Sequence, residues 1–332
     1  DHLMIETQQA DVAVEDPLLT GRELLQLRAS FFPLGFPLKL ATNSREVMDA
    51  ARKSWQFFPR LFDVSPIEVE LGVENSISSP IPSPPIFRSR GHLMSIISDA
   101  QNFSHCDFSR GFAYGWITKR VASQPDFFRY NFLEPAALVL LGQRYLAPVH
   151  AALVTRNGRG VMLCGDSFAG KSTLAYACAR TGWSFVADDA VYLVREDPTC
   201  FGIGNPYSIR FRESAKALFH ELNAWQVTTR PNGKVGFEIC TKSLAIKTAL
   251  GSKIDHVVFL NRRSVGPALL SSFPKPDALH VWKQFVNHGE DQTRAEQMKS
   301  YERLLEARVW ALTYSTLNAA VSRLNQLADS GS

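Results

Sequence analysis

The sequence predicts an α/β protein built around a phosphate-binding loop, and two stretches carry this prediction. One is an acidic pair, Asp188 and Asp189, inside an apolar run. The other fits the pattern G-x-x-x-x-G-K-[ST] and reads Gly165-Asp166-Ser167-Phe168-Ala169-Gly170-Lys171-Ser172-Thr173.

The pattern stands between a predicted strand and a predicted helix. Residues 161–164 form a short apolar run suited to a buried strand. Residues 172–180 carry the Ala, Leu and Tyr of a helix that ends before Gly182. Because a phosphate-binding loop joins a strand to a helix, these neighbours favour nucleotide binding over a coincidental glycine turn.

Each residue type in the loop has a chemical purpose. Gly165 and Gly170 let the backbone curl so that its N–H groups face phosphate oxygens, and the helix start adds its positive dipole end. Lys171 reaches the β and γ phosphates, and Ser172 offers a hydroxyl to Mg²⁺. Thr173 caps or packs the helix. The loop therefore predicts ATP and Mg²⁺ as cofactors.

The acidic pair has two interpretations. For an arbitrary Asp-Asp pair, a turn in a hairpin between residues 185–186 and 191–193 is common. Because the helix at 172–180 is short, the next strand can also return beside the loop strand and bring Asp188 and Asp189 close to Lys171 and Ser172. One carboxylate would then hold the metal and the other would accept a proton from an attacking hydroxyl. The sequence leaves open which does which, and we group Asp189 with Ser172 as metal ligands.

Residues 150–210 resemble a known family. His150, the loop and the Phe-Val-Ala-Asp-Asp strand at 185–189 are similar in order and spacing to the catalytic domain of HPr kinase/phosphorylase, a bacterial protein-serine kinase. The resemblance implies a P-loop α/β fold related to phosphoenolpyruvate carboxykinase. It also implies that the active site contains His150, Lys171, Ser172, Asp188 and Asp189.

The chain departs from that family at three places, one of which is Thr173, where a glutamate commonly follows the loop serine. Phe168 stands where a glycine is usual, so the loop either tolerates backbone strain or has a different shape. The family's Glu-Ile-Arg-Gly-Leu-Gly signature is absent, and the nearest segment, residues 207–212, keeps Arg210 without an acidic neighbour. We therefore expect kinase activity without the reverse phosphorylase activity.

Three classes of function follow from these residues. The first is a kinase that transfers the γ-phosphoryl group of ATP to a serine hydroxyl of a protein, a peptide or a small molecule. The second is a regulatory protein that senses ATP without phosphoryl transfer, which Phe168 and the missing signature favour. The third is an ATP or GTP hydrolase, for which we find no separate water-positioning residue.

Composition limits the partners and the location. A net charge of +4, with no basic run interleaved with aromatic residues, argues against a nucleic-acid groove. No apolar run reaches the length of a membrane span. The five cysteines are odd in number and lack metal-ligand spacing, so we expect buried thiols in a reducing cytoplasm. ATP, the hydroxyl acceptor and a second copy of the chain are the partners considered.

The chain divides into two predicted domains near Arg144. Residues 1–144 form an α+β domain that serves oligomerisation or substrate presentation, and residues 145–332 form the kinase-like domain. In the first domain we expect a helix after a capping box of Asn43 and Glu46. The other expected elements are strands at 36–41, 67–73, 92–98 and 255–260, a hairpin at 108–118, a loop at 76–85, and helices at 132–142, 291–308 and 315–327.

Overall fold

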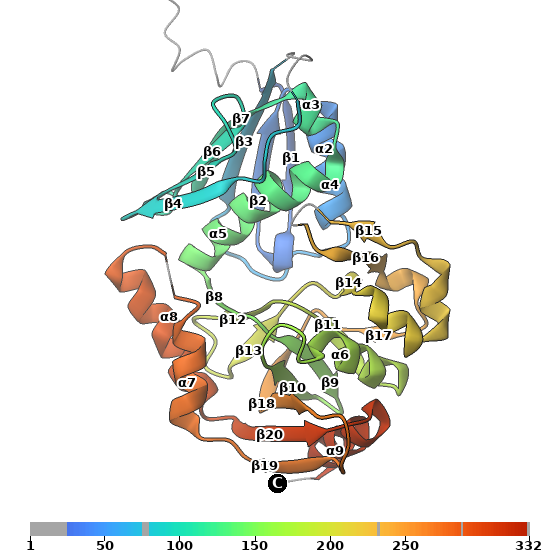
Figure 1. Ribbon diagram of the computed structural model, residues 1–332. Helices are drawn as coiled ribbons and strands as arrows, with labels where there is room; N and C mark the ends of the chain where they lie inside the picture. The colour runs from blue at the N-terminus through green and yellow to red at the C-terminus, as the bar shows by residue number, and fades with distance from the viewer. Residues whose placement is uncertain (1–24, 75–79, 231–232, 287, 331–332) are drawn as a thin grey trace, which may run out of the picture.

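The computed structural model shows a mixed α/β protein with several sheets (Figure 1). It describes residues 25–74, 80–230, 233–286 and 288–330. The first 24 residues of the predicted N-terminal domain and residues 76–79 of the expected loop lie outside this part. Residues 80–85 contain no helix or strand, as expected.

The first half of the chain forms a seven-stranded sheet covered by helices. The strand order is β1-β2-β3-β7-β6-β5-β4, with β2, β3 and β7 mutually parallel and the other pairs antiparallel. The elements of this half are β1 (Leu27–Phe31), η1 (Pro33–Gly35), β2 (Leu38–Thr42), α2 (Arg45–Trp55), β3 (Ile67–Glu74), β4 (Ile86–Arg90), β5 (Leu93–Ile97), β6 (Phe103–Asp107), β7 (Phe112–Thr118), α3 (Lys119–Ala122), α4 (Pro125–Phe128), η2 (Arg129–Leu133) and α5 (Glu134–Arg144).

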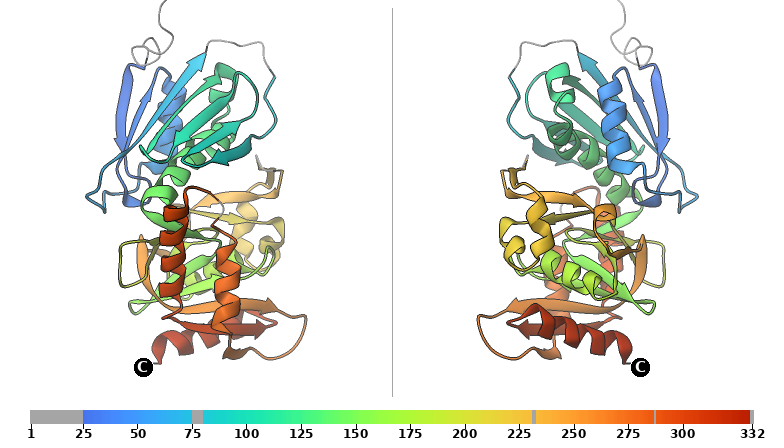
Figure 2. Two further views of the ribbon diagram at one scale, coloured as in Figure 1. Left: turned by 90° about the vertical axis from the view of Figure 1, so that its left-hand side faces the viewer. Right: turned by 90° about the vertical axis from the view of Figure 1, so that its right-hand side faces the viewer.

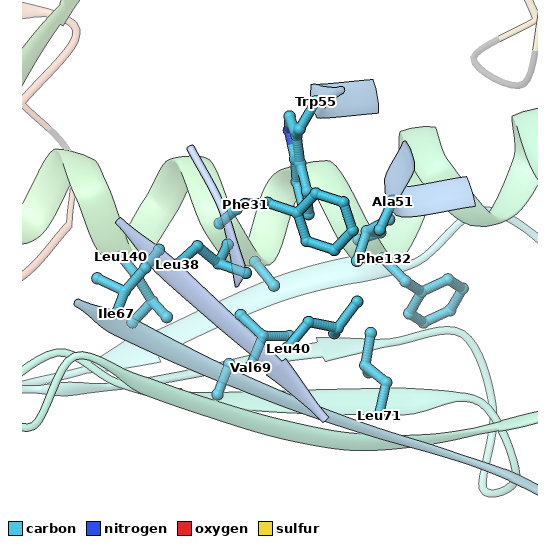
Figure 3. Packing of buried hydrophobic residues seen from close by; sticks show 14 of the residues in the cluster. Phe31, Leu38, Leu40, Ala51, Trp55, Ile67, Val69, Leu71, Phe132 and Leu140 are labelled. Carbon is cyan, nitrogen blue, oxygen red and sulfur yellow. The ribbon is translucent and has the colours of Figure 1, made fainter. Parts of the chain in front are cut away.

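Helices α2 and α5 bury one face of this sheet. In α2, Val47, Ala51 and Trp55 recur at the spacing of one helix face and are buried. Figure 3 shows Trp55 and Ala51 with Phe31, Phe132 and Leu140 on one side of β2 and β3, whose side chains Leu38, Leu40, Ile67, Val69 and Leu71 complete the cluster. Burial of this apolar surface is the main force that fixes α2 and α5 to the sheet.

The start of α2 differs from the expected capping box. Ser44, and not Asn43, is the N-cap, and its hydroxyl accepts a hydrogen bond from the N–H of Val47 at 3.4 Å. The Asn43 side chain is engaged elsewhere, because it exchanges two hydrogen bonds with the backbone of Val73 on β3, at 3.0 and 2.8 Å. The capping prediction was therefore wrong by one residue.

The second half of the chain forms a ten-stranded sheet and a separate three-stranded sheet. Helices α7 and α8 lie between β19 and β20 in the chain and α9 follows β20, and Figure 2 shows α8 and α7 beside each other with α9 at the far end of this half. The elements are β8 (Leu146–Val149), β9 (Ala152–Arg156), β10 (Arg159–Cys164), α6 (Lys171–Arg180), β11 (Ser184–Ala187), β12 (Val191–Val194), β13 (Phe201–Ile203), β14 (Ser208–Phe211), η3 (Glu213–Ala217), η4 (His220–Ala224), β15 (Thr228–Thr229), β16 (Val235–Cys240), η5 (Thr241–Ser243), β17 (Lys247–Thr248), β18 (Gly251–Arg262), β19 (Leu269–Ser272), α7 (Lys275–Lys283), α8 (Asp291–Leu304), β20 (Arg308–Tyr314) and α9 (Leu317–Asp329).

The order of the large sheet corrects two expectations about the acidic pair. Its main path is β17-β11-β9-β10-β18-β13-β12-β8, so β11 and β12 are not neighbours and the residues between them do not form a hairpin turn. Strand β11 does not lie beside β10 either, because β9 pairs antiparallel with both and separates them. Strands β10 and β11 therefore run parallel with one antiparallel strand between them.

Several predicted elements have different ends. The helix expected at 132–142 begins as the π-helical turn η2 and continues as α5, and the expected hairpin is β6 with β7. The helix expected at 291–308 ends at Leu304, because Arg308 already begins β20, which pairs with β18. Not all five thiols are buried: Cys240 is exposed and Cys200 is half-buried.

Contacts join the two halves near the C-terminal end of α2. The Tyr207 hydroxyl donates a hydrogen bond to the carbonyl of Phe57 at 2.8 Å, and its ring lies edge-on to Phe58 at 4.9 Å. The Tyr145 hydroxyl donates to the carbonyl of Ser65 at 2.7 Å. Within the described ranges, no helix is both long and apolar enough to cross a membrane.

Candidate functional site

The loop at 165–173 joins β10 to α6, as its sequence predicts. Gly165 and Gly170 have φ values of 145° and 91°, and Phe168 also lies in the left-handed region at 75°. Gly170 directly precedes the first residue of α6, so the free N–H groups of the first helical turn open towards the loop. This is the backbone arrangement that binds phosphate at a helix N-terminus.

The Lys171 side chain bonds to the backbone at the start of its own loop. Its ammonium group donates to the carbonyl oxygens of Gly165, at 2.7 Å, and Asp166, at 3.0 Å. The side chain is buried, and this burial lowers the pKa of Lys171, while the nearby carboxylate of Asp189 acts in the opposite direction. The ammonium group donates to two neutral carbonyl groups, and a phosphate group in the loop would give it a negatively charged partner.

The predicted partners of the loop lie beside it. The Ser172 hydroxyl donates to the backbone carbonyl of Asp188 at 3.3 Å. His150 Nδ1 lies 2.9 Å from the carbonyl oxygen of Asp189 and 3.5 Å from its carboxylate Oδ1. The structure thus brings together all five residues that the sequence nominated. It does so although β11 is one strand further from the loop strand than expected.

The two aspartates have contrasting environments. Asp188 is buried, with 8% of its surface exposed, whereas the Asp189 side chain is 57% exposed. Burial raises the pKa of Asp188 to about 7, although the backbone N–H of Arg210 donates to its Oδ2 at 2.7 Å and opposes this shift. Adjacent residues in the sequence therefore present one enclosed and one open carboxyl group.

Arg210 does have an acidic partner, contrary to the expectation from the sequence. Its Nε donates to Glu238 Oε2 at 3.1 Å, because the two residues stand directly opposite each other in the antiparallel pair of β14 and β16. The guanidinium group also lies 5.7 Å from the ring centre of Tyr130. The expectation that Arg210 lacks an acidic partner was therefore wrong, while the absence of the family signature from the sequence is unchanged and the lack of a reverse reaction stays a prediction.

Arg212 lies against the loop itself. Its guanidinium carbon is 3.5 Å from the ring centre of Phe168, whose side chain is 76% exposed. Arg210 and Arg212 are two residues apart in an extended stretch, so the sequence predicts that they share one face. In the structure Arg210 contacts Glu238, whereas Arg212 contacts Phe168 of the phosphate loop. The stack with Arg212 is a favourable contact that accompanies the positive φ of Phe168.

Tyr314, at the end of β20, is a supporting residue that sequence reasoning missed. Its hydroxyl donates to the carbonyl of Ala169 at 3.3 Å and would lie 2.9 Å from a Cβ atom added at Gly170. Only the pairing of β20 with β18 carries Tyr314 to the loop, and neither its spacing nor its neighbours in the sequence signal this contact.

The donor atoms at the loop fit Mg²⁺. Among the described residues no three His, Cys, Asp or Glu side chains gather into a metal site. Mg²⁺ needs no such cage, since it is commonly held by one or two protein oxygens together with nucleotide phosphates and water. The hydroxyl of Ser172 and the open carboxylate of Asp189 are oxygen donors of that kind.

A small cavity of about 130 Å³ lies beside the aspartates and is lined by both halves of the chain. Asp188, Asp189 and Arg210 contribute from the second half, and Trp55 and Phe58 contribute from the first. Two larger cavities, of about 490 and 540 Å³, are lined by neither the phosphate loop nor the acidic pair.

Comparisons with known proteins give only distant structural likenesses, of which one is described here. No protein-family model and no curated protein matches the chain. Among solved structures, the HPr(Ser) kinase/phosphatase from Coxiella burnetii matches with a TM-score of 0.29 and 14% identity, covering 55% of this chain and 99% of that chain. The resemblance is distant. The site is therefore interpreted from its own residues.

Proposed function

We propose that this protein binds Mg-ATP in the loop at 165–173 and transfers the γ-phosphoryl group to a hydroxyl acceptor. The observation that carries the proposal is the hydrogen bond from Ser172 to the carbonyl of Asp188, at 3.3 Å. It supports a site in which a phosphate-binding loop and two carboxylates act on the same group, as phosphoryl transfer requires.

Each residue has a proposed role. The loop N–H groups and Lys171 would hold the phosphates, and Ser172 and Asp189 would hold Mg²⁺, which neutralises charge on the departing group. Asp188, enclosed and facing the small cavity, would receive the acceptor's proton. His150 would orient Asp189 through the contacts of its Nδ1 atom.

Nucleotide binding is tested by replacing the loop lysine. Lys171→Ala removes a charge-assisted contact worth about 1.5 to 3 kcal/mol, so calorimetry should show Mg-ATP affinity falling by roughly ten- to more than a hundredfold. Lys299→Ala, on the exposed face of α8, is the matched control and should bind like the natural protein. Equal affinity in Lys171→Ala and the natural protein would disprove the site.

Transfer is tested at the acidic pair. We expect Asp188→Asn and Asp189→Asn each to abolish turnover, and Asp189→Asn alone to weaken the Mg²⁺-dependent part of nucleotide binding. Asp277→Asn, on the exposed first turn of α7, controls for loss of a surface carboxylate. Wild-type transfer in both site variants would show that the pair has no part in the reaction.

A regulatory protein that binds ATP without transfer is the second candidate, and Phe168 is the observation that favours it. Phe168 stands where glycine is usual in the resembling family. Its positive φ and its stack with Arg212 restrict the conformations that the loop can adopt. This function predicts tight Mg-ATP binding with neither phosphorylated product nor ADP release. Product formation that depends on Asp188 would exclude it.

A further inference from the structure

The cavity beside the acidic pair has a defined place between the two halves of the chain. On one side it meets the end of α2, through Trp55 and Phe58, and the start of α5, through Glu134 and Leu138. On the other side it meets Asp188 and Asp189. A molecule in this cavity would touch the N-terminal half and the proposed transfer residues at once.

The acidic pair borders both this cavity and the phosphate loop. The backbone of Asp188 accepts a hydrogen bond from Ser172 in the loop, while Asp188 also lines the cavity. Nucleotide phosphates in the loop and an acceptor in the cavity would therefore both lie beside the acidic pair. This is the relation that direct transfer between two bound substrates needs.

The volume of the cavity limits the acceptor. At about 130 Å³ the cavity is much smaller than the other two, which suits a hydroxymethyl group on a unit no larger than a small amino acid. The buried rings of Trp55 and Phe58 close the apolar side, so we expect a small aliphatic hydroxyl group to be accepted in preference to a tyrosyl ring. Trp55 is fixed by its contact with Phe31, at 5.8 Å between ring centres.

The charges around the cavity limit the acceptor further. Glu134 is already compensated, since its carboxylate accepts hydrogen bonds from Arg129 and from Ser54, both at 2.8 Å. Arg210, the basic side chain among the lining residues, pairs with Glu238, so the lining offers no unpaired cation to an acceptor carboxylate. An acceptor that is neutral or cationic overall is favoured here over one with a net negative charge.

We propose that this cavity is the acceptor site, that it takes a primary hydroxymethyl group on a small neutral or cationic unit, and that Trp55 and Phe58 of the N-terminal half set its size limit. In the reaction the acceptor oxygen bonds to the γ-phosphorus, and the bond from that phosphorus to the β–γ bridging oxygen breaks. ADP leaves with the electron pair, and the hydroxyl proton passes to Asp188. This inference rests on the proposed kinase function.

Free serine and a seryl side chain of a peptide share this chemistry, so the test uses both. The natural protein is incubated with Mg-ATP and either L-serine, the peptide Gly-Gly-Ser-Gly-Gly or its tyrosine counterpart, and phosphorylated product is measured. We expect product with at least one serine acceptor and none with tyrosine. Turnover of free serine identifies a small-molecule kinase, and turnover of the peptide alone identifies a peptide kinase.

A cavity-filling variant tests the location. Leu138→Phe adds volume from a partly exposed position on α5, and Val139→Phe, next to it but outside the cavity lining, is the matched control. We expect Leu138→Phe to raise the KM for the serine acceptor at least tenfold without changing the Kd for Mg-ATP, and Val139→Phe to change neither. Phe58→Leu, which widens the apolar wall more gently than alanine would, should admit larger alcohols as acceptors.

The outcomes separate this inference from the proposed function. If Mg-ATP does not bind to the natural protein, the proposed function itself is wrong. If ATP binds and serine is phosphorylated, but Leu138→Phe and Phe58→Leu leave the KM and the choice of acceptor unchanged, only the acceptor site is wrong. Phosphorylation of the tyrosine peptide would likewise overturn the assignment of this cavity, whereas ATP binding without product from any of the three acceptors would overturn the proposed transfer itself.

Discussion

Phe168 stores backbone strain in the phosphate loop, and two substitutions separate that strain from the contact its ring makes. At a φ of 75° a residue with a Cβ atom costs about 1–2 kcal/mol, which glycine avoids. Glycine in turn loses about 0.4–1 kcal/mol through the larger entropy of its unfolded chain. Phe168→Gly should therefore be more stable than Phe168→Ala by about 1 kcal/mol.

The free energy of unfolding of the natural protein should be above that of Phe168→Ala and close to that of Phe168→Gly. Phe168→Ala keeps the strain but loses the stack with Arg212, and because the ring is 76% exposed little buried apolar area is lost with it. We expect this variant to be less stable than the natural protein by about 0.5–1 kcal/mol. Phe168→Gly should lie within about 0.5 kcal/mol of the natural protein, since relief of strain offsets the lost contact.

Urea unfolding measures these differences as shifts of the midpoint at constant slope. Arg212→Ala is the matched control, because it should cost as much as Phe168→Ala and add little in that background. An alanine variant as stable as the glycine variant would refute the strain at residue 168. Additive losses from Phe168→Ala and Arg212→Ala would refute their contact.

Two further predictions concern the loop and the thiols. Gly170→Ala should destabilise the protein by about 1–3 kcal/mol in the same assay, because a Cβ at a φ of 91° would stand 2.9 Å from the Tyr314 hydroxyl; an unchanged midpoint would contradict this. Iodoacetamide should label exposed Cys240 quickly in the folded protein. Because burial raises the pKa of Cys164 to about 12, that thiol should stay unlabelled at pH 9 until urea unfolds the chain. Mass spectrometry of tryptic peptides measures the labelling, and label on Cys164 before unfolding would contradict this prediction.

The sequence predicted the parts of the candidate site that depend on neighbouring residues. The loop, its strand and its helix follow from local residue types, so β10 and α6 lie within two residues of their expected ends. The apolar residues before Asp188 likewise predicted a strand that leads to the acidic pair. Strand β11 ends at Ala187, immediately before Asp188. Local patterning determines such elements because burial and turn chemistry act within a few residues.

Pairing between distant strands escaped prediction. The insertion of β9 between β10 and β11, and the register that sets Arg210 against Glu238, depend on contacts that no local pattern records. The same is true of the cavity, whose lining joins Trp55 to Asp188 across 133 positions (188 − 55). The expected capping residue failed for a related reason, because Asn43 is used by Val73, 30 residues away.

The contact between Tyr314 and Ala169 also sets an order in time during synthesis. The two residues are 145 positions apart, so at about 5–20 residues per second the ribosome adds Tyr314 roughly 7 to 30 s after Ala169. Until then β20 cannot pair with β18, and the loop lacks the hydroxyl that holds its carbonyl. A nascent chain therefore contains the whole loop sequence well before Tyr314 can support the loop. The proposed nucleotide site would be complete only after β20 has been synthesised.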